Sequence, residues 1–168
     1  AGEELIMSTK QVQDAYIVAA TRTPIGKAPR GMFRHTRPDD LLVAAVRHAL
    51  AQVPNLDPKA IEDAIIGCSF PEAEQGINMA RAAMVIAGLP HSVGGVTINR
   101  FCASGLDAVN FAAAQVMAGQ HDLTVGGGVE SMSRVGIGAS GGAWPVDPMI
   151  ALPAYFMPQG VSADLIAT

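Results

Sequence analysis

The sequence is poor in charged residues, in aromatic residues and in cysteine. Charged residues make up 15% of the 168 residues, aromatic residues make up 5%, and there are two cysteines. A chain with so few charges and 49% hydrophobic residues is folded rather than disordered. Because bulky rings are scarce and there are 18 glycines, helices can pack closely on a sheet. The composition therefore favours a sheet buried on both faces, and it suits a large interface between subunits.

The same scarcities exclude several classes of protein. A net charge of −4 argues against a nucleic-acid-binding protein. No apolar run approaches the length of a membrane span, and the first residues are too acidic for a transit peptide. No metal-ligand spacing joins the cysteines and histidines, which are Cys68, Cys102, His35, His48, His91 and His121. We therefore expect a protein of a reducing compartment, the cytoplasm, without a metal ion.

Short apolar runs alternate with helical patterns over most of the chain. This order predicts an α/β fold with a mainly parallel sheet and right-handed crossovers. The predicted strands are 15–21, 64–70, 95–99 and 122–132; the predicted helices are 38–53, 55–63, 78–89 and 103–119.

The last part of the chain has a different pattern. Between residues 133 and 160, glycine and proline recur without a clear period, which is typical of a binding loop or a lid. A helix then opens with Ser162 as its N-cap and stops at Thr168 without a C-cap. We expect the chain to be a fragment, or its continuation to be missing.

Cys102 lies where a predicted strand gives way to a predicted helix. The thiolate is the nucleophilic form of cysteine, and unpaired N–H groups in the first turn of a helix favour a negative charge. The same N–H groups can stabilise an oxyanion, and the small residues Ala103 and Gly105 leave room for a substrate. The alternative is a buried cysteine that packs as a small hydrophobic residue. Position alone leaves both interpretations open.

A nucleophilic cysteine also needs a base, and no histidine here is an obvious candidate. His91 precedes the third predicted strand, and His121 follows the third long helix, at the opposite edge of the sheet from Cys102. If Cys102 is catalytic, we expect its base beyond residue 168. Cys68 is predicted to be a core residue.

Four stretches, in order along the chain, resemble motifs of the thiolase family. The stretch "NRFCASGLDAV" is similar to the motif of the nucleophilic cysteine. The others are "VAATRTPIGK" (18–27), "PEAEQGINMARAA" (71–83) and "GGGVESMSRV" (126–135). The ending "YFMPQGVSADLIAT" is similar to the degradative branch, the 3-ketoacyl-CoA thiolases, and to thiolase subunits of fatty-acid-oxidation complexes.

The resemblance implies a layered α/β/α fold and a set of roles. Cys102 would be the nucleophile that carries the acyl group, and Met157 would lie near the acyl and pantetheine pocket. Gly126, Gly127 and Gly128 would allow a tight turn below the active site, although an ordinary strand end explains them equally well. The histidine, the second cysteine and the asparagine of the family would lie in a second domain beyond this chain. Coenzyme A would be a substrate, so no tightly bound cofactor is implied.

The resemblance also implies a domain organisation and partners. Residues 1–14 would be a tail, 15–132 an incomplete N-terminal domain, and 133–168 the start of an inserted loop domain. The partners would be acyl-CoA, CoA and further copies in a homodimer or homotetramer, with the stretch "GGVTINRFC" (94–102) at the dimer edge, and the chain could belong to a β-oxidation complex. The alternatives are an acetoacetyl-CoA thiolase of biosynthetic type, another condensing enzyme such as a ketoacyl synthase, or an inactive fragment or scaffold.

Overall fold

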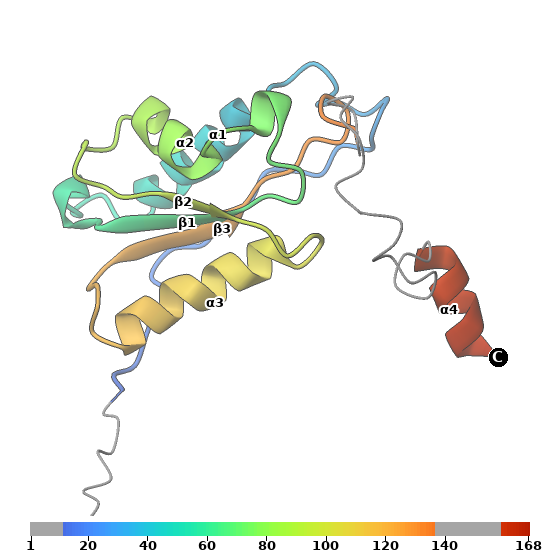
Figure 1. Cartoon of the computed structure of the whole chain (residues 1–168). Coiled ribbons are helices and arrows are strands. Elements are labelled where there is room, and N and C mark those ends of the chain that lie inside the picture. Colours follow the sequence, from blue (N-terminus) through green and yellow to red (C-terminus); the bar gives the residue numbers. More distant parts are fainter. Residues whose placement is uncertain (1–11, 137–158) are drawn as a thin grey trace, which may run out of the picture. The chain divides into compact units, whose positions relative to one another are not determined.

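The computed structural model describes residues 12–136 and 159–168. The chain divides into two units after residue 137, and each is described by itself. The first unit contains a parallel three-stranded sheet in the order β2-β1-β3 (Figure 1). The strands are β1 (Asp63–Gly67), β2 (Val96–Ile98) and β3 (Thr124–Gly128). They confirm the predicted parallel sheet, with shorter strands than the apolar runs indicated.

Helices cover both faces of the sheet. The helices α1 (Pro38–Ala51) and α2 (Met79–Ala87) lie on one face, and α3 (Ser104–Met117) lies on the other (Figure 1). Two single turns of 3₁₀ helix, η1 (Pro58–Ala60) and η2 (Ala73–Gln75), lie in the connections. The predicted α/β/α layering is confirmed. Among the described residues, no helix is long and apolar enough to cross a membrane.

The ends of α2 show how the sequence sets a helix boundary. The side chain of Asn78 accepts a hydrogen bond from the Arg81 N–H at 3.1 Å and so caps the first turn. Gly88 ends the helix with φ at 92°, in the left-handed region that glycine adopts without a steric penalty. The same reasoning applies to η1, where Asp57 accepts the Lys59 N–H at 3.0 Å ahead of Pro58.

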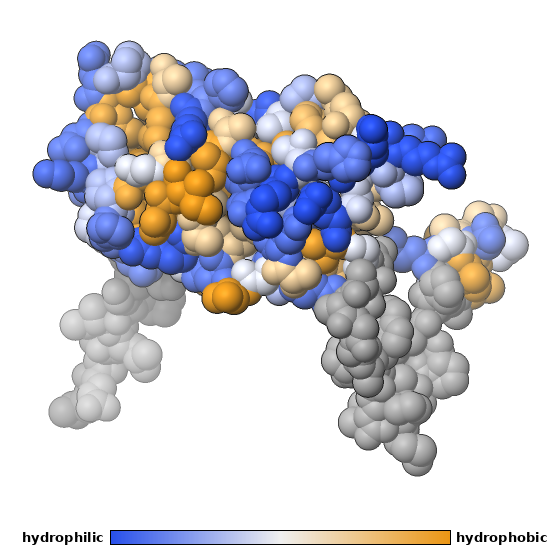
Figure 2. All heavy atoms as spheres, turned by 90° about the horizontal axis from the view of Figure 1, so that it is seen from above, coloured by the Kyte–Doolittle hydropathy of each residue, from blue (hydrophilic) through white to orange (hydrophobic). Residues whose placement is uncertain are grey.

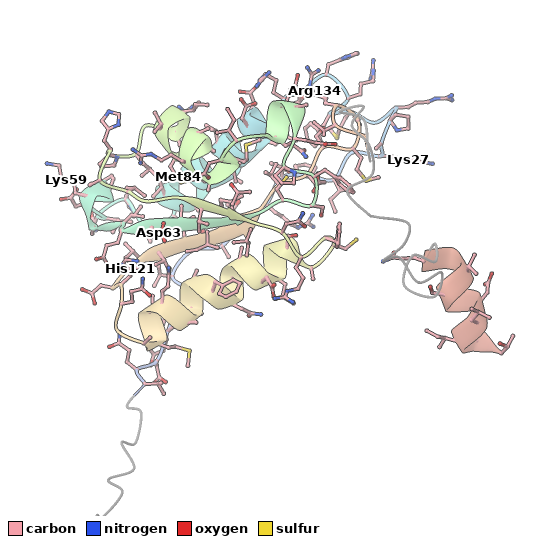
Figure 3. The ribbon with its side chains drawn as sticks, in the orientation of Figure 1. Lys27, Lys59, Asp63, Met84, His121 and Arg134 are labelled. Carbon is pink, nitrogen blue, oxygen red and sulfur yellow. The ribbon has the colours of Figure 1, made fainter. Side chains whose placement is uncertain are left out.

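The main hydrophobic core lies between the sheet and the layer formed by α1 and α2. Figure 3 shows Met84 of this core pointing from α2 towards the sheet. Figure 2 looks down on this side of the molecule, where apolar side chains gather among hydrophilic ones. The buried core residues here are Leu42, Val43, Val46, Ile61, Ala64, Ile66, Met79, Ala80, Ala83, Met84, Leu89 and Val93.

The opposite face is packed differently, because glycines bring α3 against the strands. A Cβ on Gly67 of β1 would overlap the Ser104 carbonyl group and lie 2.6 Å from the Gly105 nitrogen. A Cβ on Gly126 of β3 would lie 2.9 Å from the Val109 Cα. Among the described residues, the apolar cluster buried on this face is small and consists of Ile65, Ala108 and Ala112, with Ile98 beside it. The sheet thus has one deep apolar face and one face of close backbone contact.

The structure decides between the two interpretations of the glycines, and it contradicts the predicted first strand. Gly126, Gly127 and Gly128 form the end of β3, as the strand-end interpretation expects, and make no turn; the glycines with positive φ in the described part of the chain are Gly88 and Gly119. Residues 15–21 form no strand. Tyr16, for example, is 78% exposed. An apolar, β-branched pattern shows that a segment can be extended but not that a neighbouring strand is present to pair with it.

The segment 15–21 is nevertheless held to the first unit. Gln52 is the residue that follows α1. Its side chain donates a hydrogen bond to the Ala20 carbonyl at 2.9 Å and accepts one from the Ala20 N–H at 3.3 Å. The Gln13 N–H donates to the carbonyl of Met117, at the end of α3. The segment is therefore tied to helix ends rather than to the sheet.

The second unit, as far as it is described, is the helix α4 (Gln159–Ala167). The predicted helix is confirmed, but its start is not. Ser162 lies inside α4, one turn after the first helical residue, so it is not the N-cap. Met157 and most of the stretch 133–160 lie outside the described residues.

Candidate active site

Cys102 lies in a sharp turn between β2 and α3. The residue before it, Phe101, has φ at 47°, in the left-handed region that a bulky side chain rarely adopts. The helix begins at Ser104 with Ala103 as N-cap, so Cys102 precedes the helix by two residues. The predicted helix 103–119 is therefore present, with its start one residue later than expected. The strained turn presents Cys102 as an exposed thiol in front of the helix.

Hydrogen bonds to two polar side chains hold this turn. The Ser104 hydroxyl accepts the Arg100 N–H at 2.8 Å and donates to the Phe101 carbonyl at 2.6 Å, and Ser104 is only 3% exposed. The Asn99 side chain accepts the Phe101 N–H at 2.8 Å. Arg100 also pairs with Asp107 on α3. Because both backbone groups of Phe101 are bonded, the unusual φ is fixed by its neighbours.

The side chains of Ser104 and Asn99 were not among the predicted site residues. A serine at the start of a helix and an asparagine at the end of a strand are common signals of capping and turns. Those signals predict a turn here, but they do not show that both side chains bond the backbone of Phe101, the residue before the cysteine.

Cys102 lines a hollow of about 370 Å³ at the carboxyl end of the sheet. Its walls come from the ends of β1 and β3 and from the start of α3. Its lining includes Cys68, Ser69, Phe101, Ser104 and Glu130. Three chain segments far apart in the sequence thus meet at the cysteine, as the parallel sheet requires for loops at one edge.

Cys68 lies in the same hollow but in a different environment. It is 1% exposed, as predicted for a core residue. Burial, together with the charge of Glu130, raises the pKa of the Cys68 thiol from 9.0 to about 11. Cys68 therefore stays a neutral thiol at neutral pH and is a poor nucleophile. Of the two cysteines, Cys102 alone combines exposure with a place before a helix.

No histidine lines the hollow among residues 12–136 and 159–168, which include all four histidines. His121 lies at the other end of the sheet, with Asp63, while Lys27 and Arg134 lie at the end where the loop after β3 begins (Figure 3). The Nδ1 atom of His121 lies 3.6 Å from the Glu62 carboxylate. None of the four histidines therefore lines the hollow beside Cys102. The described residues also contain no cluster of metal ligands.

The fold and the site together define an α/β protein with an exposed cysteine at a strand-to-helix turn. Comparisons with known proteins show which family it belongs to. The family described as "Thiolase, N-terminal domain" matches residues 15–147. The chain therefore belongs to the thiolase family.

Relatives with printed names agree with this assignment. The chain is 41% identical over 160 residues to a 3-ketoacyl-CoA thiolase of Bacillus subtilis, covering 93% of this chain and 40% of that protein. It is 48% identical over 123 residues to the 3-oxoadipyl-CoA/3-oxo-5,6-dehydrosuberyl-CoA thiolase of Escherichia coli, covering 73% of this chain and 30% of that protein. The chain thus spans about two fifths, or less, of the length of these relatives.

A solved structure shares the fold. The crystal structure of the acetyl-CoA acetyltransferase of Bacillus anthracis matches with a TM-score of 0.68 and 34% sequence identity. The match covers 74% of this chain and 31% of that chain. The predicted thiolase-like fold is therefore confirmed.

Proposed function

We propose that the protein containing this chain is a 3-ketoacyl-CoA thiolase. It would cleave 3-ketoacyl-CoA with CoA to give acetyl-CoA and a shortened acyl-CoA, as in fatty-acid β-oxidation. The exposed Cys102 at a strained turn is the observation that supports this most strongly. The names of the relatives support the substrate class.

The proposed reaction has two halves. The Cys102 thiolate attacks the 3-keto carbonyl carbon, the bond between carbons 2 and 3 breaks, and the departing acetyl-CoA takes up a proton at carbon 2. The acyl group stays on the Cys102 sulfur as a thioester. The thiol of a second CoA then gives up its proton and attacks this thioester, which returns Cys102 to the thiolate.

The parts of the chain have separate roles in this proposal. The hollow beside Cys102 would receive the reacting carbonyl, and N–H groups near the start of α3 would stabilise the oxyanion. Met157 would contact the acyl or pantetheine chain, and residues 133–168 would belong to an inserted loop domain that follows the N-terminal domain, residues 15–132. The base would come from outside this chain. CoA serves as substrate, and no tightly bound cofactor is needed.

Steady-state thiolysis by the purified full-length protein tests the proposal. We expect consumption of 3-ketoacyl-CoA that depends on free CoA, and greater kcat/KM for acyl chains longer than acetoacetyl. The Bacillus anthracis relative supports a second candidate, an acetyl-CoA acetyltransferase. That candidate predicts a preference for acetoacetyl-CoA. Absence of any CoA-dependent cleavage would contradict both.

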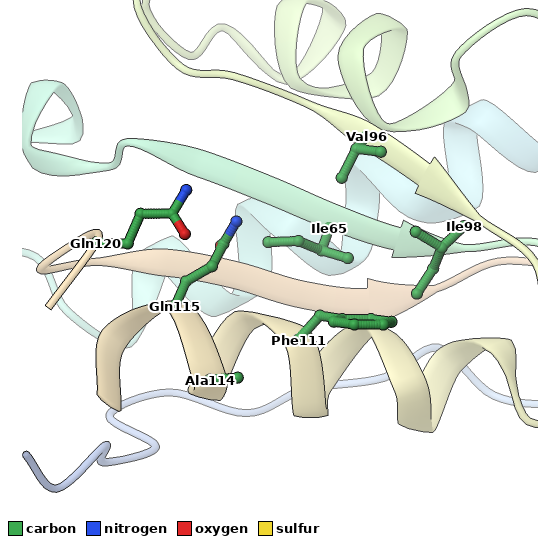
Figure 4. Close-up of a pocket in the computed structure, with 7 residues that line it drawn as sticks. All are labelled: Ile65, Val96, Ile98, Phe111, Ala114, Gln115 and Gln120. Atoms are coloured by element: carbon green, nitrogen blue, oxygen red, sulfur yellow. The ribbon is translucent and has the colours of Figure 1, made fainter. Parts of the chain in front are cut away.

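We also propose that the protein is a homodimer, or a tetramer built from that dimer, joined through β2 and α3. The strand β2 is an edge of the sheet, and Val96 on it is 41% exposed. Beside it, an apolar groove of about 390 Å³ runs between β2 and α3 (Figure 4). It is lined by Ile65, Val96, Ile98, Phe111, Ala114, Gln115 and Gln120.

The exposed edge of the sheet also favours a second copy as the occupant of this groove. An exposed, apolar edge strand otherwise invites uncontrolled association, and pairing it with its own copy removes that edge. A C₂ dimer presents the same surface on both subunits, as such pairing requires.

Replacing Val96 with lysine tests this interface. The charge would be buried against the second copy, so Val96→Lys should weaken association and lower activity together. Val85→Lys is the matched control, because Val85 is 42% exposed but lies on α2, on the other face of the sheet. Sedimentation velocity measures the result. A Val96→Lys protein that stays as dimeric as Val85→Lys would contradict the interface.

The proposed chemistry also bears on compartment and partners. Both cysteines of the described chain are free, and a thiolate nucleophile must stay reduced to work. This supports a reducing compartment such as the cytoplasm. Membership of a β-oxidation complex would be seen as co-purification with enzymes that supply 3-ketoacyl-CoA.

A further inference from the structure

Beneath the turn of Cys102 lies a pair of polar side chains that the proposed mechanism does not use. Gln75, the last residue of η2, has an exposed fraction of 0%, which is unusual for a glutamine. Its Nε2 donates to Oε1 of Glu130 at 2.6 Å and to the Phe70 carbonyl at 2.9 Å, and it lies 3.4 Å from the Cys68 sulfur. Its Oε1 accepts the Ser131 N–H at 2.6 Å. Both ends of the amide are therefore satisfied.

Glu130, which follows β3, connects this glutamine to Ser69 near the end of β1. Its Oε2 accepts the Ser69 N–H at 2.7 Å. One carboxylate thus binds a side chain and a backbone group of the same connection between β1 and α2, and hydrogen bonds to a charged acceptor are stronger than neutral ones. Glu130 also lines the hollow that contains Cys102.

The network continues from Ser69 to the turn itself. The Ser69 carbonyl accepts Nδ2 of Asn99 at 2.9 Å, and Oδ1 of Asn99 accepts the Phe101 N–H at 2.8 Å. Phe101 is the residue with the left-handed φ, directly before Cys102. An unbroken run of hydrogen bonds therefore joins the buried Gln75 to the strained residue that presents the nucleophile.

We propose that Gln75 and Glu130 form a positioning pair that fixes the turn of Cys102 through Ser69 and Asn99. The inference rests on the proposed role of Cys102 as nucleophile. A strained φ persists only when its surroundings over-determine it, and this run of hydrogen bonds connects the turn to the loops after β1 and β3. The pair touches neither substrate nor the reacting sulfur in this role; it acts through the backbone.

Glu130→Gln is the principal variant. It keeps the size of the side chain but removes its charge. The new amide presents either a nitrogen, which cannot accept, or a neutral oxygen, which is a weaker acceptor, to the donors Gln75 Nε2 and Ser69 N–H, so the link between these residues loosens. We expect kcat to fall by roughly 10- to 100-fold, because small misplacements of a reacting group have effects of that size. We expect KM for 3-ketoacyl-CoA to change much less than kcat, because a positioning role acts on the reacting sulfur rather than on the binding of CoA.

A second readout is the rate at which iodoacetamide alkylates Cys102, mapped to its peptide and measured on the folded protein at one fixed pH. Positioning predicts slower alkylation in Glu130→Gln, because the thiol moves away from the start of α3. A purely electrostatic role predicts faster alkylation, because removal of a nearby negative charge favours a thiolate. A purely structural role lowers the midpoint of thermal unfolding and leaves both kcat and the alkylation rate of Cys102 unchanged.

Glu62→Gln is the matched control. Glu62 also joins two segments with its carboxylate, accepting the Asp122 N–H at 2.6 Å, but it does so at the opposite end of β1. Its loss should leave alkylation of Cys102 unchanged. The exchange variant, Glu130→Gln with Gln75→Glu, restores a carboxylate facing an amide and should recover part of the lost kcat and alkylation rate.

Asn99→Ala keeps the test decisive if the buried variants fail to fold. It cuts the network at an exposed residue next to the turn, and it should slow alkylation as Glu130→Gln does. Alkylation in either variant that equals Glu62→Gln, or exceeds wild type, would overturn the positioning role. Absence of thiolysis in the wild-type protein would instead refute the proposed function, and the alkylation rates would still decide the role of the pair.

Discussion

The loops that follow β1 and β2 leave the same edge of the sheet, and each carries one cysteine. The strands are parallel neighbours, with Gly67 of β1 opposite Ile98 of β2. The first loop places Cys68 directly after its strand, buried at 1% exposure. The second places Cys102 four residues after its strand, exposed and next to a backbone in the left-handed region. The two thiols thus line the same hollow, but one is buried and the other is exposed.

This difference teaches that the environment, rather than the residue type, decides what a cysteine does. Burial and the charge of Glu130 raise the pKa of the Cys68 thiol to about 11, so it remains protonated and inert. Cys102 is open to a substrate and lies before the N-terminus of α3. The same hollow therefore holds one buried, protonated thiol and one exposed thiol, and the exposed one is the proposed nucleophile.

Removing the Cys102 thiol should have the largest effect. We expect Cys102→Ala to lower kcat of the full-length protein by roughly three orders of magnitude or more, because no acyl thioester can form. The midpoint of thermal unfolding should stay close to wild type, since the residue is exposed. Thiolysis assays and a thermal melt check this. Retained turnover would place the nucleophile elsewhere.

A methyl group at Gly67 should displace the start of α3 and, with it, the turn that contains Cys102. The start of α3 packs directly on this glycine, so Gly67→Ala forces the helix away from β1. We expect a loss of about 1–3 kcal/mol in the free energy of unfolding, with a fall in kcat. Gly127→Ala is the control, because its Cβ would meet only the Ile66 side chain, at 3.9 Å. Chemical denaturation measures both, and equal effects would show that α3 does not depend on this close contact.

Alkaline pH should act on the loop of Cys68. The folded state raises the pKa of this thiol from 9.0 to about 11, so the folded state holds the proton more tightly than the unfolded state. The resulting stabilisation is fully present below pH 9 and is lost as pH rises towards 11. The free energy of unfolding should fall over this window, and less steeply in Cys68→Ala. Identical slopes in the two proteins would show that Cys68 titrates normally.

Replacing Cys68 itself should have the smallest effect on catalysis. We expect Cys68→Ala to keep kcat within about threefold of wild type and to lose roughly 1 kcal/mol of stability, as for a small buried side chain. Thiolysis and urea denaturation at neutral pH provide the measurements. A loss of activity comparable to that of Cys102→Ala would remove the contrast between the two loops.

The order of elements and most helix ends could be predicted because their signals are local. Asn78 and Gly88 mark α2, and Pro58 opens η1, through hydrogen bonds or dihedral angles set by the residue itself. Residues 15–21 carry an equally clear local pattern but form no strand. A strand needs a partner, and the pattern of one segment contains no information about its neighbours.

The candidate site shows the same limit. Cys102 could be singled out because its own motif stands at a strand-to-helix junction. The pairing of Gln75 with Glu130 spans 55 residues and depends on how two loops meet in space. The strained φ of Phe101 likewise results from bonds made by Asn99 and Ser104. The long-range pair has no periodicity and follows only from the folded arrangement, while the local bonds around Phe101 predict a turn but not its φ angle.

The most direct test of the central claim is to trap the acyl group on the enzyme. The full-length protein would be incubated with an acyl-CoA in the absence of free CoA, digested under acidic conditions, and its peptides mapped by mass spectrometry. The account predicts a single acylated peptide containing Cys102, with Cys68 unmodified and the label released when CoA is added. Acylation of Cys68, or a stable label that CoA does not remove, would contradict it.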